Sequence, residues 1–112
     1  EDHHWVVVEG EAAVLGAAYF APETMTQGTW NLYFIAVAPT AQGKGAGASL
    51  LAHVEEFLRQ RGERVLLVET SGLESFALTR KFYRKNGYAE EARIREFYQA
   101  GEDKVVFWKA LG

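Results

Sequence analysis

The sequence contains no cysteine and only two prolines among its 112 residues. Without cysteine, neither a disulfide framework nor a thiolate zinc site can form. This composition fits the reducing cytoplasm, which we take as the expected location. The chain also lacks a long apolar run. Its most apolar stretch, Val65–Val68 with its neighbours, is far shorter than the roughly 20 residues that span a bilayer, so we expect no contact with membranes.

Positive charge is not in excess, since 12 lysines and arginines stand against 15 acidic residues and the net charge is −3. A general nucleic-acid-binding surface is therefore not expected. His3 and His4 are adjacent and lack the spacing of a metal site, so we expect no metal either. Hydrophobic residues make up 48% of the chain, and we expect one domain over residues 1–112. Because the chain begins with Glu1 and not with methionine, we expect it to be a piece of a longer product.

Several segments have the composition and length of β-strands. They are Trp5–Glu9, Ala12–Ala21, Trp30–Val37, Arg64–Thr70, Ile94–Tyr98 and Lys104–Trp108. The first two predict a hairpin around Gly10, and the last two predict a closing hairpin around residues 100–103. The almost continuous apolar run at 64–70 is typical of a strand that is buried on both faces.

Two segments have helical periodicity. The first follows Gly47 and ends before Gly62, and its apolar residues recur at Leu50, Leu51, Val54, Phe57 and Leu58. The second is predicted to begin at Ser71-x-x-Glu74, which has the spacing of a capping box, and to run to Asn86 before Gly87.

On the second helix, Ala77, Leu78 and Phe82 fall at core spacing and predict packing. Four basic residues form two stripes on the same helix: Arg80, Lys81, Arg84 and Lys85. We interpret these stripes as a solvated face, with attraction of a polyanionic ligand as the alternative.

The predicted order of elements is ββ–β–α–β–α–ββ. The strand–helix–strand unit over residues 30–70 requires a parallel pair with a right-handed crossover, whereas the flanking hairpins are antiparallel. The predicted fold class is therefore α/β: a mixed, mostly antiparallel sheet with one central parallel βαβ pair and flanking helices.

A glycine-rich turn, Gln42–Ser49, joins the strand Trp30–Val37 to the first helix. Its glycines let a ligand approach the backbone, and the unpaired N–H groups at a helix N-terminus favour an anion such as a phosphate. A plain turn that binds nothing is the alternative. A P-loop is excluded because Lys44 is followed by Gly45 and not by Ser or Thr. A dinucleotide fingerprint is excluded because the glycine spacing fails after Gly47.

Three motifs occur in order around this turn. The segment Gln42–Gly47 is Gln-x-x-Gly-x-Gly, Val37-Ala38-Pro39 precedes it, and Phe82–Tyr88 has the pattern Phe-Tyr-x-x-x-Gly-Tyr. Together they resemble the GNAT superfamily of acyl-CoA-dependent N-acetyltransferases, over roughly Trp5 to Leu111. The resemblance implies a GNAT-like fold whose N-terminal elements are missing from this chain. It also implies transfer of an acetyl group from acetyl-CoA to a primary amine by direct attack.

The resemblance further implies roles for individual residues. Backbone groups of Ile35, Ala36 and Val37 are expected to bind the pantetheine arm. The pyrophosphate is expected on the amides of Gln42, Gly43, Lys44, Gly45, Ala46 and Gly47. Tyr83 is expected to act as the general acid that protonates the departing thiolate, with simple packing of a half-buried ring as the alternative.

The acceptor side of the site is less well defined. Many family members place a glutamate base where this chain has Asn31, which cannot accept a proton. Glu23 or Glu69 acting through water, and an amine that arrives neutral, both stay open. We expect Asn31 and Tyr33 to contact the acceptor, a small-molecule or peptide amine of unknown identity. Other aromatic residues either line this pocket or belong to the core: Trp30, Phe97 and Tyr98. Phe76 replaces an asparagine that contacts CoA in many members, so only packing or stacking is expected there.

A second hypothesis for the function of the chain is non-catalytic. Because Asn31 replaces the usual acid and the family's N-terminal elements are missing, a module that only binds acyl-CoA or a partner is the alternative function. A sheet edge left unprotected by such a truncation favours association, so a homodimer is a further expectation.

Overall fold

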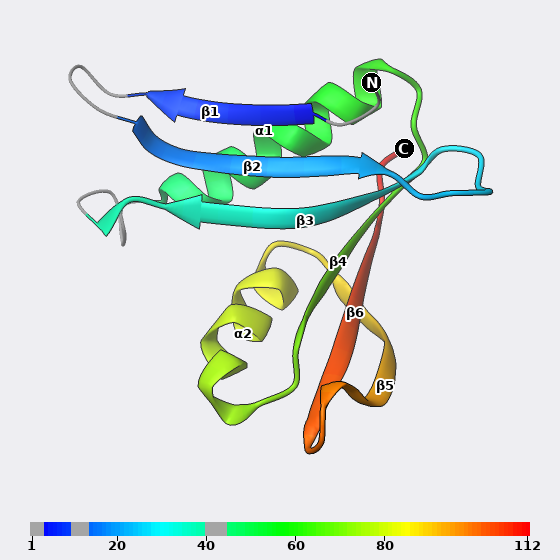
Figure 1. Ribbon diagram of the computed structural model, residues 1–112. Helices are drawn as coiled ribbons and strands as arrows, with labels where there is room; N and C mark the ends of the chain where they lie inside the picture. The colour runs from blue at the N-terminus through cyan, green and yellow to red at the C-terminus, as the bar shows by residue number, and fades with distance from the viewer. Residues whose placement is uncertain (1–3, 10–13, 40–44) are drawn as a thin grey trace.

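The computed structural model describes residues 4–9, 14–39 and 45–112 (Figure 1). Its elements, in chain order, are β1 (His4–Glu9), β2 (Val14–Pro22), β3 (Thr29–Val37), α1 (Ala46–Gln60), β4 (Val65–Ser71), the 3₁₀ turn η2 (Glu74–Phe76), α2 (Ala77–Lys85), β5 (Ala89–Gln99) and β6 (Glu102–Ala110). The strands form one sheet in the order β1-β2-β3-β4-β6-β5. Only β3 and β4 pair in parallel, and the other four described pairings are antiparallel. The predicted fold class is therefore confirmed.

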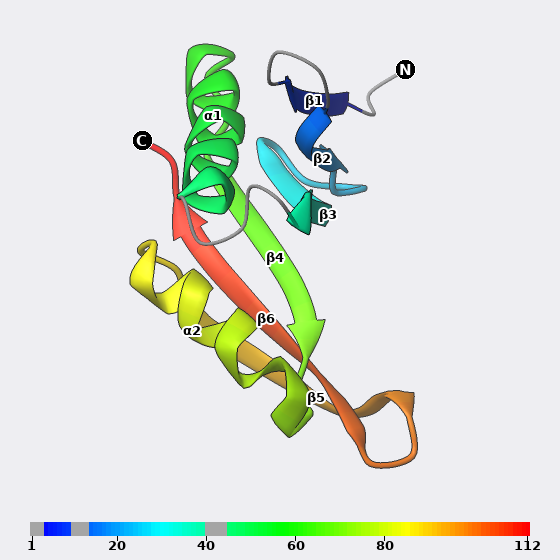
Figure 2. The same cartoon turned by 90° about the vertical axis from the view of Figure 1, so that its left-hand side faces the viewer.

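Both helices lie on one side of the sheet (Figure 2). They cover a core that runs through β2, β3, β4 and β6 and is built from Ala18, Phe20, Trp30, Leu32, Leu50, Leu51, Val54, Leu58, Leu66, Val68, Tyr83, Tyr88, Val105, Phe107 and Leu111. Trp30, which the sequence left between core and acceptor pocket, is 3% exposed and belongs to this core. Neither described helix is long and apolar enough to cross a bilayer.

The start of α2 differs from the prediction. The capping box at Ser71 and Glu74 does not form: Ser71 is the last residue of β4, and its Oγ accepts the N–H of Leu73 at 3.1 Å. A single 3₁₀ turn follows, and α2 begins only at Ala77. The prediction that Leu78 packs in the core is also wrong: this residue is 80% exposed, and the buried residue of α2 is Tyr83.

The edge strand β5 is irregular. All of its residues are exposed, and its register with β6 shifts between Glu90 and Ala92 and again between Ile94 and Gln99. Within the second shift Glu96 has a φ of 52°, a left-handed conformation that is uncommon for a residue other than glycine. Its backbone N–H donates to Asp103 Oδ1 at 2.9 Å, so β6 holds the kink in place.

Candidate active site

The two central strands separate part of the way along the sheet. Only Thr29–Leu32 of β3 pairs with Val65–Val68 of β4, although β3 continues to Val37 and β4 continues to Ser71. Figure 1 shows the strands diverging beyond this point. Opposite β2, the register skips Tyr33, which makes it the extra residue of a β-bulge. The bulge bends β3 away from β4 and exposes the backbone of its second half.

One hollow, of about 530 Å³, lies at the N-terminus of α1. It is lined by Val37, Gly45, Ala46, Gly47, Ala48, Phe82, Lys85 and Asn86. Gly45 precedes the helix with a φ of 78°, and a Cβ added there would meet no described atom within 4 Å. The first helical hydrogen bond runs from the Ser49 N–H to the Gly45 carbonyl, so the N–H groups of residues 46–48 have no helical partner. An anion fits these donors.

A second hollow, of about 540 Å³, continues from the first along the diverging part of β3. Its lining residues are Ile35, Ala36, Val37, Gly47, Leu78, Thr79, Phe82 and Tyr83. Val37, Gly47 and Phe82 line both hollows, which are therefore adjoining parts of one groove. The groove brings together six residues expected at the cofactor site with the expected acid Tyr83. Gln42, Gly43 and Lys44 lie outside the described residues.

Tyr83 occupies the border between this groove and the core. Its side chain is 4% exposed and its ring packs 5.7 Å from that of Phe107 and 5.8 Å from that of Tyr88. Burial raises the pKa of Tyr83 to about 12, so its hydroxyl stays protonated at neutral pH. Among the residues that the structure describes, this hydroxyl has no hydrogen-bond partner.

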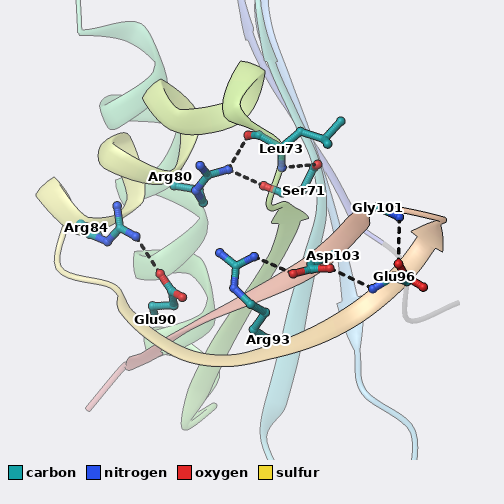
Figure 3. Close-up of polar contacts among 9 residues, drawn as sticks. All are labelled: Ser71, Leu73, Arg80, Arg84, Glu90, Arg93, Glu96, Gly101 and Asp103. Atoms are coloured by element: carbon teal, nitrogen blue, oxygen red, sulfur yellow. Dashed lines mark hydrogen bonds and ion pairs between the residues drawn. The ribbon is translucent and has the colours of Figure 1, made fainter.

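Arg80 fixes the position of α2 and hence of Tyr83. Its Nη1 donates to the carbonyls of Ser71 and Leu73 at 2.7 and 2.8 Å, which joins the helix to the end of β4 (Figure 3). The Gly72 N–H donates to the Asp103 carbonyl at 2.9 Å and ties the same connection to β6. The basic stripes of α2 are therefore not uniform. Arg80 is structural, Arg84 pairs with Glu90 at 2.7 Å, and Lys85 lines the groove.

Asn31 lies in a polar group at the point where β3 and β4 separate. Its neighbours Trp30 and Leu32 point into the helix-covered core, so its own side chain lies on the other face of the sheet. It is 1% exposed, and its Nδ2 donates to Glu23 at 2.8 Å and to Glu69 at 3.0 Å. The second Glu69 oxygen accepts from Lys104 Nζ at 3.3 Å. The Asn31 Oδ1 atom is buried and has no partner among the described residues.

Aromatic side chains border this polar group. Tyr33 is 54% exposed, and burial together with the carboxylates of Glu23 and Glu69 raises its pKa. The pKa of Tyr98 is also raised, first by burial and then by Glu69 and Glu102. The Lys104 ammonium lies 3.9 Å from the centroid of the Phe97 ring. The sequence predicted Tyr33, Phe97 and Tyr98 as candidates for the acceptor pocket, but it did not predict that Lys104 contacts both Phe97 and Glu69.

Comparison with known proteins identifies the family. The family model described as the acetyltransferase (GNAT) domain matches residues 1–90. This chain belongs to the GNAT acetyltransferases. One curated relative is an amino-acid acetyltransferase of Ralstonia nicotianae, which is 36% identical over 105 residues. Those residues are 94% of this chain and 23% of the relative, so the GNAT chain spans about a quarter of the relative's length.

Solved structures of GNAT proteins have the same arrangement. An acetyltransferase assigned to the family, from Desulfovibrio desulfuricans, superposes with a TM-score of 0.96 at 40% identity and covers 99% of this chain and 70% of its own. An aminoglycoside 6′-N-acetyltransferase solved with coenzyme A gives a TM-score of 0.86 at 14% identity, over 99% of this chain and 74% of its own. The latter match concerns the fold alone. Phe76, placed beside CoA by analogy with the family, is 38% exposed and is not among the residues that line the groove.

Proposed function

We propose that this GNAT chain transfers an acetyl group from acetyl-CoA to a primary amine. The observation that carries the proposal is the continuous groove that runs from the N-terminus of α1 to Tyr83. One end of the groove presents backbone N–H groups that have no partner within the helix, and the other presents a buried hydroxyl that keeps its proton. These are the groups that a phosphate-bearing thioester requires at its two ends.

The residues present fit acetyl-CoA as the co-substrate, which supplies the activated acetyl group as a thioester. The amides of Gly45, Ala46 and Gly47 would hold the phosphates, and those of Ala46 and Gly47 have no partner within the helix. Lys85 adds a positive charge to the same wall of the groove. The diverging backbone of Ile35–Val37 would bind the pantetheine arm. Open space at Gly45 and the absence of a side-chain cap there leave the donors accessible. Gln42, Gly43 and Lys44 stay candidates for the same role.

Tyr83 is proposed as the general acid. Its Oη–H would donate to the sulfur as the carbon–sulfur bond breaks, and a backbone N–H near Val37 would support the oxygen of the thioester carbonyl. Because α2 is joined to β4 through Arg80, Tyr83 is held in one place against the groove. Such positioning makes a single proton donor effective. Asn31 and Tyr33 are proposed on the acceptor side, on the opposite face of the sheet.

Calorimetric titration with acetyl-CoA tests the proposal, with dephospho-CoA and adenosine as partial ligands. Gly45→Asp puts a carboxylate beside the proposed phosphate donors and should abolish measurable binding. Gly62→Asp is the matched control: Gly62 also has a positive φ, of 79°, and also has open space at its Cβ, but it follows the other end of α1. Equal binding by both variants would contradict the phosphate site.

The non-catalytic alternative is tested on the same samples. Release of free CoA thiol from acetyl-CoA, measured in the presence of a panel of primary amines, distinguishes an enzyme from a module that only binds. Tight binding of acetyl-CoA without thiol release above the rate seen without protein would favour the binding module.

A further inference from the structure

The group formed by Glu23, Asn31 and Glu69, called the apex group below, contains an acceptor atom that lacks a donor. Asn31 is 1% exposed, and both hydrogens of its Nδ2 are used, one by each carboxylate. Its Oδ1 is buried and has no partner among the described residues. A buried carbonyl oxygen without a hydrogen bond is unfavourable, because it loses its bond to water and gains no other. Because this atom can only accept, its missing partner must be a donor.

The charge of the apex group specifies which donor fits. Glu23 and Glu69 are two carboxylates, and among the described residues Lys104 is the one cation that pairs with either of them, so the group retains one negative charge. The donor should therefore be cationic. Among the described residues no cluster of three or more acidic or histidine side chains is arranged to hold a metal ion. An organic cation is the better match.

The structure already contains an example of such a cation in this environment. The Lys104 ammonium lies between Glu69 Oε1, at 3.3 Å, and the face of the Phe97 ring, at 3.9 Å. A carboxylate on one side and an aromatic ring on the other is the arrangement that binds alkylammonium groups. Tyr33 offers a second ring close enough to Glu23 and Glu69 to feel their charges, and at 54% exposure it borders solvent.

The position of the apex group relative to the groove suits an acceptor. It lies where β3 and β4 stop pairing, whereas the groove follows the diverging part of β3 on the helix-covered side. A molecule bound at the apex group therefore approaches the opening from the face opposite to the groove. Glu69 is 27% exposed in its side chain, so this face is accessible to solvent.

We propose that the apex group binds an ammonium group of the acceptor and thereby selects amines that carry no neighbouring carboxylate. That the bound amine is the acceptor rests on the proposed function, whereas the cation site itself is argued from the contacts of the apex group. The ammonium would donate to Asn31 Oδ1 and to a carboxylate of Glu23 or Glu69. It would replace one of the two hydrogen bonds that Asn31 Nδ2 now donates to these carboxylates. An α-carboxylate on the ligand would face the net negative charge and be repelled.

The direct test is a nuclear magnetic resonance titration that follows the side-chain amide of Asn31. L-alaninamide and L-alanine are matched probes, because they differ only in a neutral amide against a carboxylate. L-alaninamide should shift the Asn31 side-chain signals in a saturable manner, and L-alanine should bind at least ten-fold more weakly. Absence of a saturable shift, or equal binding of the two probes, would overturn the proposal.

Variants of the carboxylates make the test specific. Glu69→Gln and Glu23→Gln keep the shape of the side chain and remove its charge, and each should weaken L-alaninamide binding by about 10- to 100-fold. Glu56→Gln is the control, since Glu56 is an exposed carboxylate on α1, on the helix-covered side of the sheet and hence on the face opposite to the apex group. Unchanged binding in both apex variants, with midpoints of thermal unfolding close to wild type, would refute the assignment.

Titration of the same samples with acetyl-CoA keeps the two proposals apart. If acetyl-CoA binds and Asn31 does not respond to L-alaninamide, the cation site is wrong and the proposed function stands. If Asn31 responds and acetyl-CoA does not bind, the proposed function fails and the cation site stands.

Discussion

Two neighbouring tyrosines allow catalysis and stability to be separated in one experiment. Tyr83 and Tyr88 are 4% and 3% exposed, and their ring centroids lie 5.8 Å apart. The Tyr83 hydroxyl has no described protein partner, whereas Tyr88 Oη donates to Glu55 Oε2 at 2.7 Å. Replacing each with phenylalanine removes one oxygen from almost the same place in the molecule.

The expected effects have opposite patterns. Tyr83→Phe removes no protein hydrogen bond, so the free energy of unfolding should change by less than about 1 kcal/mol. Loss of a general acid should lower kcat by about 10²- to 10⁴-fold, which corresponds to about 3–5 kcal/mol of transition-state stabilisation. Tyr88→Phe leaves the Glu55 carboxylate, 5% exposed, without its hydroxyl donor and should cost about 1–3 kcal/mol of stability. Its kcat should stay within a few-fold of wild type.

Stopped-time thiol release at saturating acetyl-CoA and amine gives kcat, calorimetry gives the acetyl-CoA Kd, and urea unfolding gives the stability of each variant. The acetyl-CoA Kd should be nearly the same in all three proteins, because the hydroxyl is assigned to the chemical step. A Tyr83→Phe variant that retains kcat, or that loses stability as Tyr88→Phe does, would refute the reasoning.

Further expectations concern pH and the groove. Burial raises the pKa of Tyr83 to about 12, so its hydroxyl keeps its proton up to about pH 10. The kcat profile should therefore show no falling limb from this residue between pH 7 and about 10, and a limb that disappears in Tyr83→Phe would contradict this. Hydrogen bonds from the Glu96 N–H and from Arg93 lower the pKa of Asp103, so this carboxylate stabilises the fold above its unfolded pKa of about 4 and loses that effect as pH falls through the lower folded value. Acid unfolding of Asp103→Asn should therefore depend less steeply on pH than that of wild type. Leu78→Ala should change the free energy of unfolding by less than about 0.5 kcal/mol, because Leu78 is 80% exposed. It should raise the acetyl-CoA Kd about five-fold, because it removes apolar contact from the groove; an unchanged Kd would exclude Leu78 from the site.

Much of the fold was predictable because local pattern and chain connectivity agree. The apolar run before Thr70 forms β4, which buries Leu66 and Val68 under the helices and leaves Leu67 half-buried on the other face. Because a helix connects β3 to β4, the two neighbouring strands run parallel. The start of α2 was not predictable in this way. Ser71 and Glu74 have the right spacing for a cap, but Ser71 remains in β4 and Arg80, nine residues later, binds its carbonyl.

The candidate site also has a part that local sequence motifs predict and a part that they do not. The glycines and Tyr83 stand in motifs of consecutive residues, so the sequence was able to point to them. The environment of Asn31 depends on Glu69, which is 38 residues away and meets it only because β3 and β4 are neighbours. From the sequence alone, Asn31 is a missing base; in the structure it links two carboxylates. Only the pairing of distant strands carries that information.

The irregular course of β5 has a consequence for contacts between copies of the chain. A strand from another molecule can join a sheet only where the outer strand offers an unbroken row of backbone donors and acceptors. The two register shifts of β5 and the left-handed Glu96 interrupt that row, whereas β1, at the opposite border, pairs without a shift from His4 to Val8. The two borders of the sheet are therefore unequal, and a homodimer, which stays a prediction, would extend the sheet through β1 and leave β5 facing water.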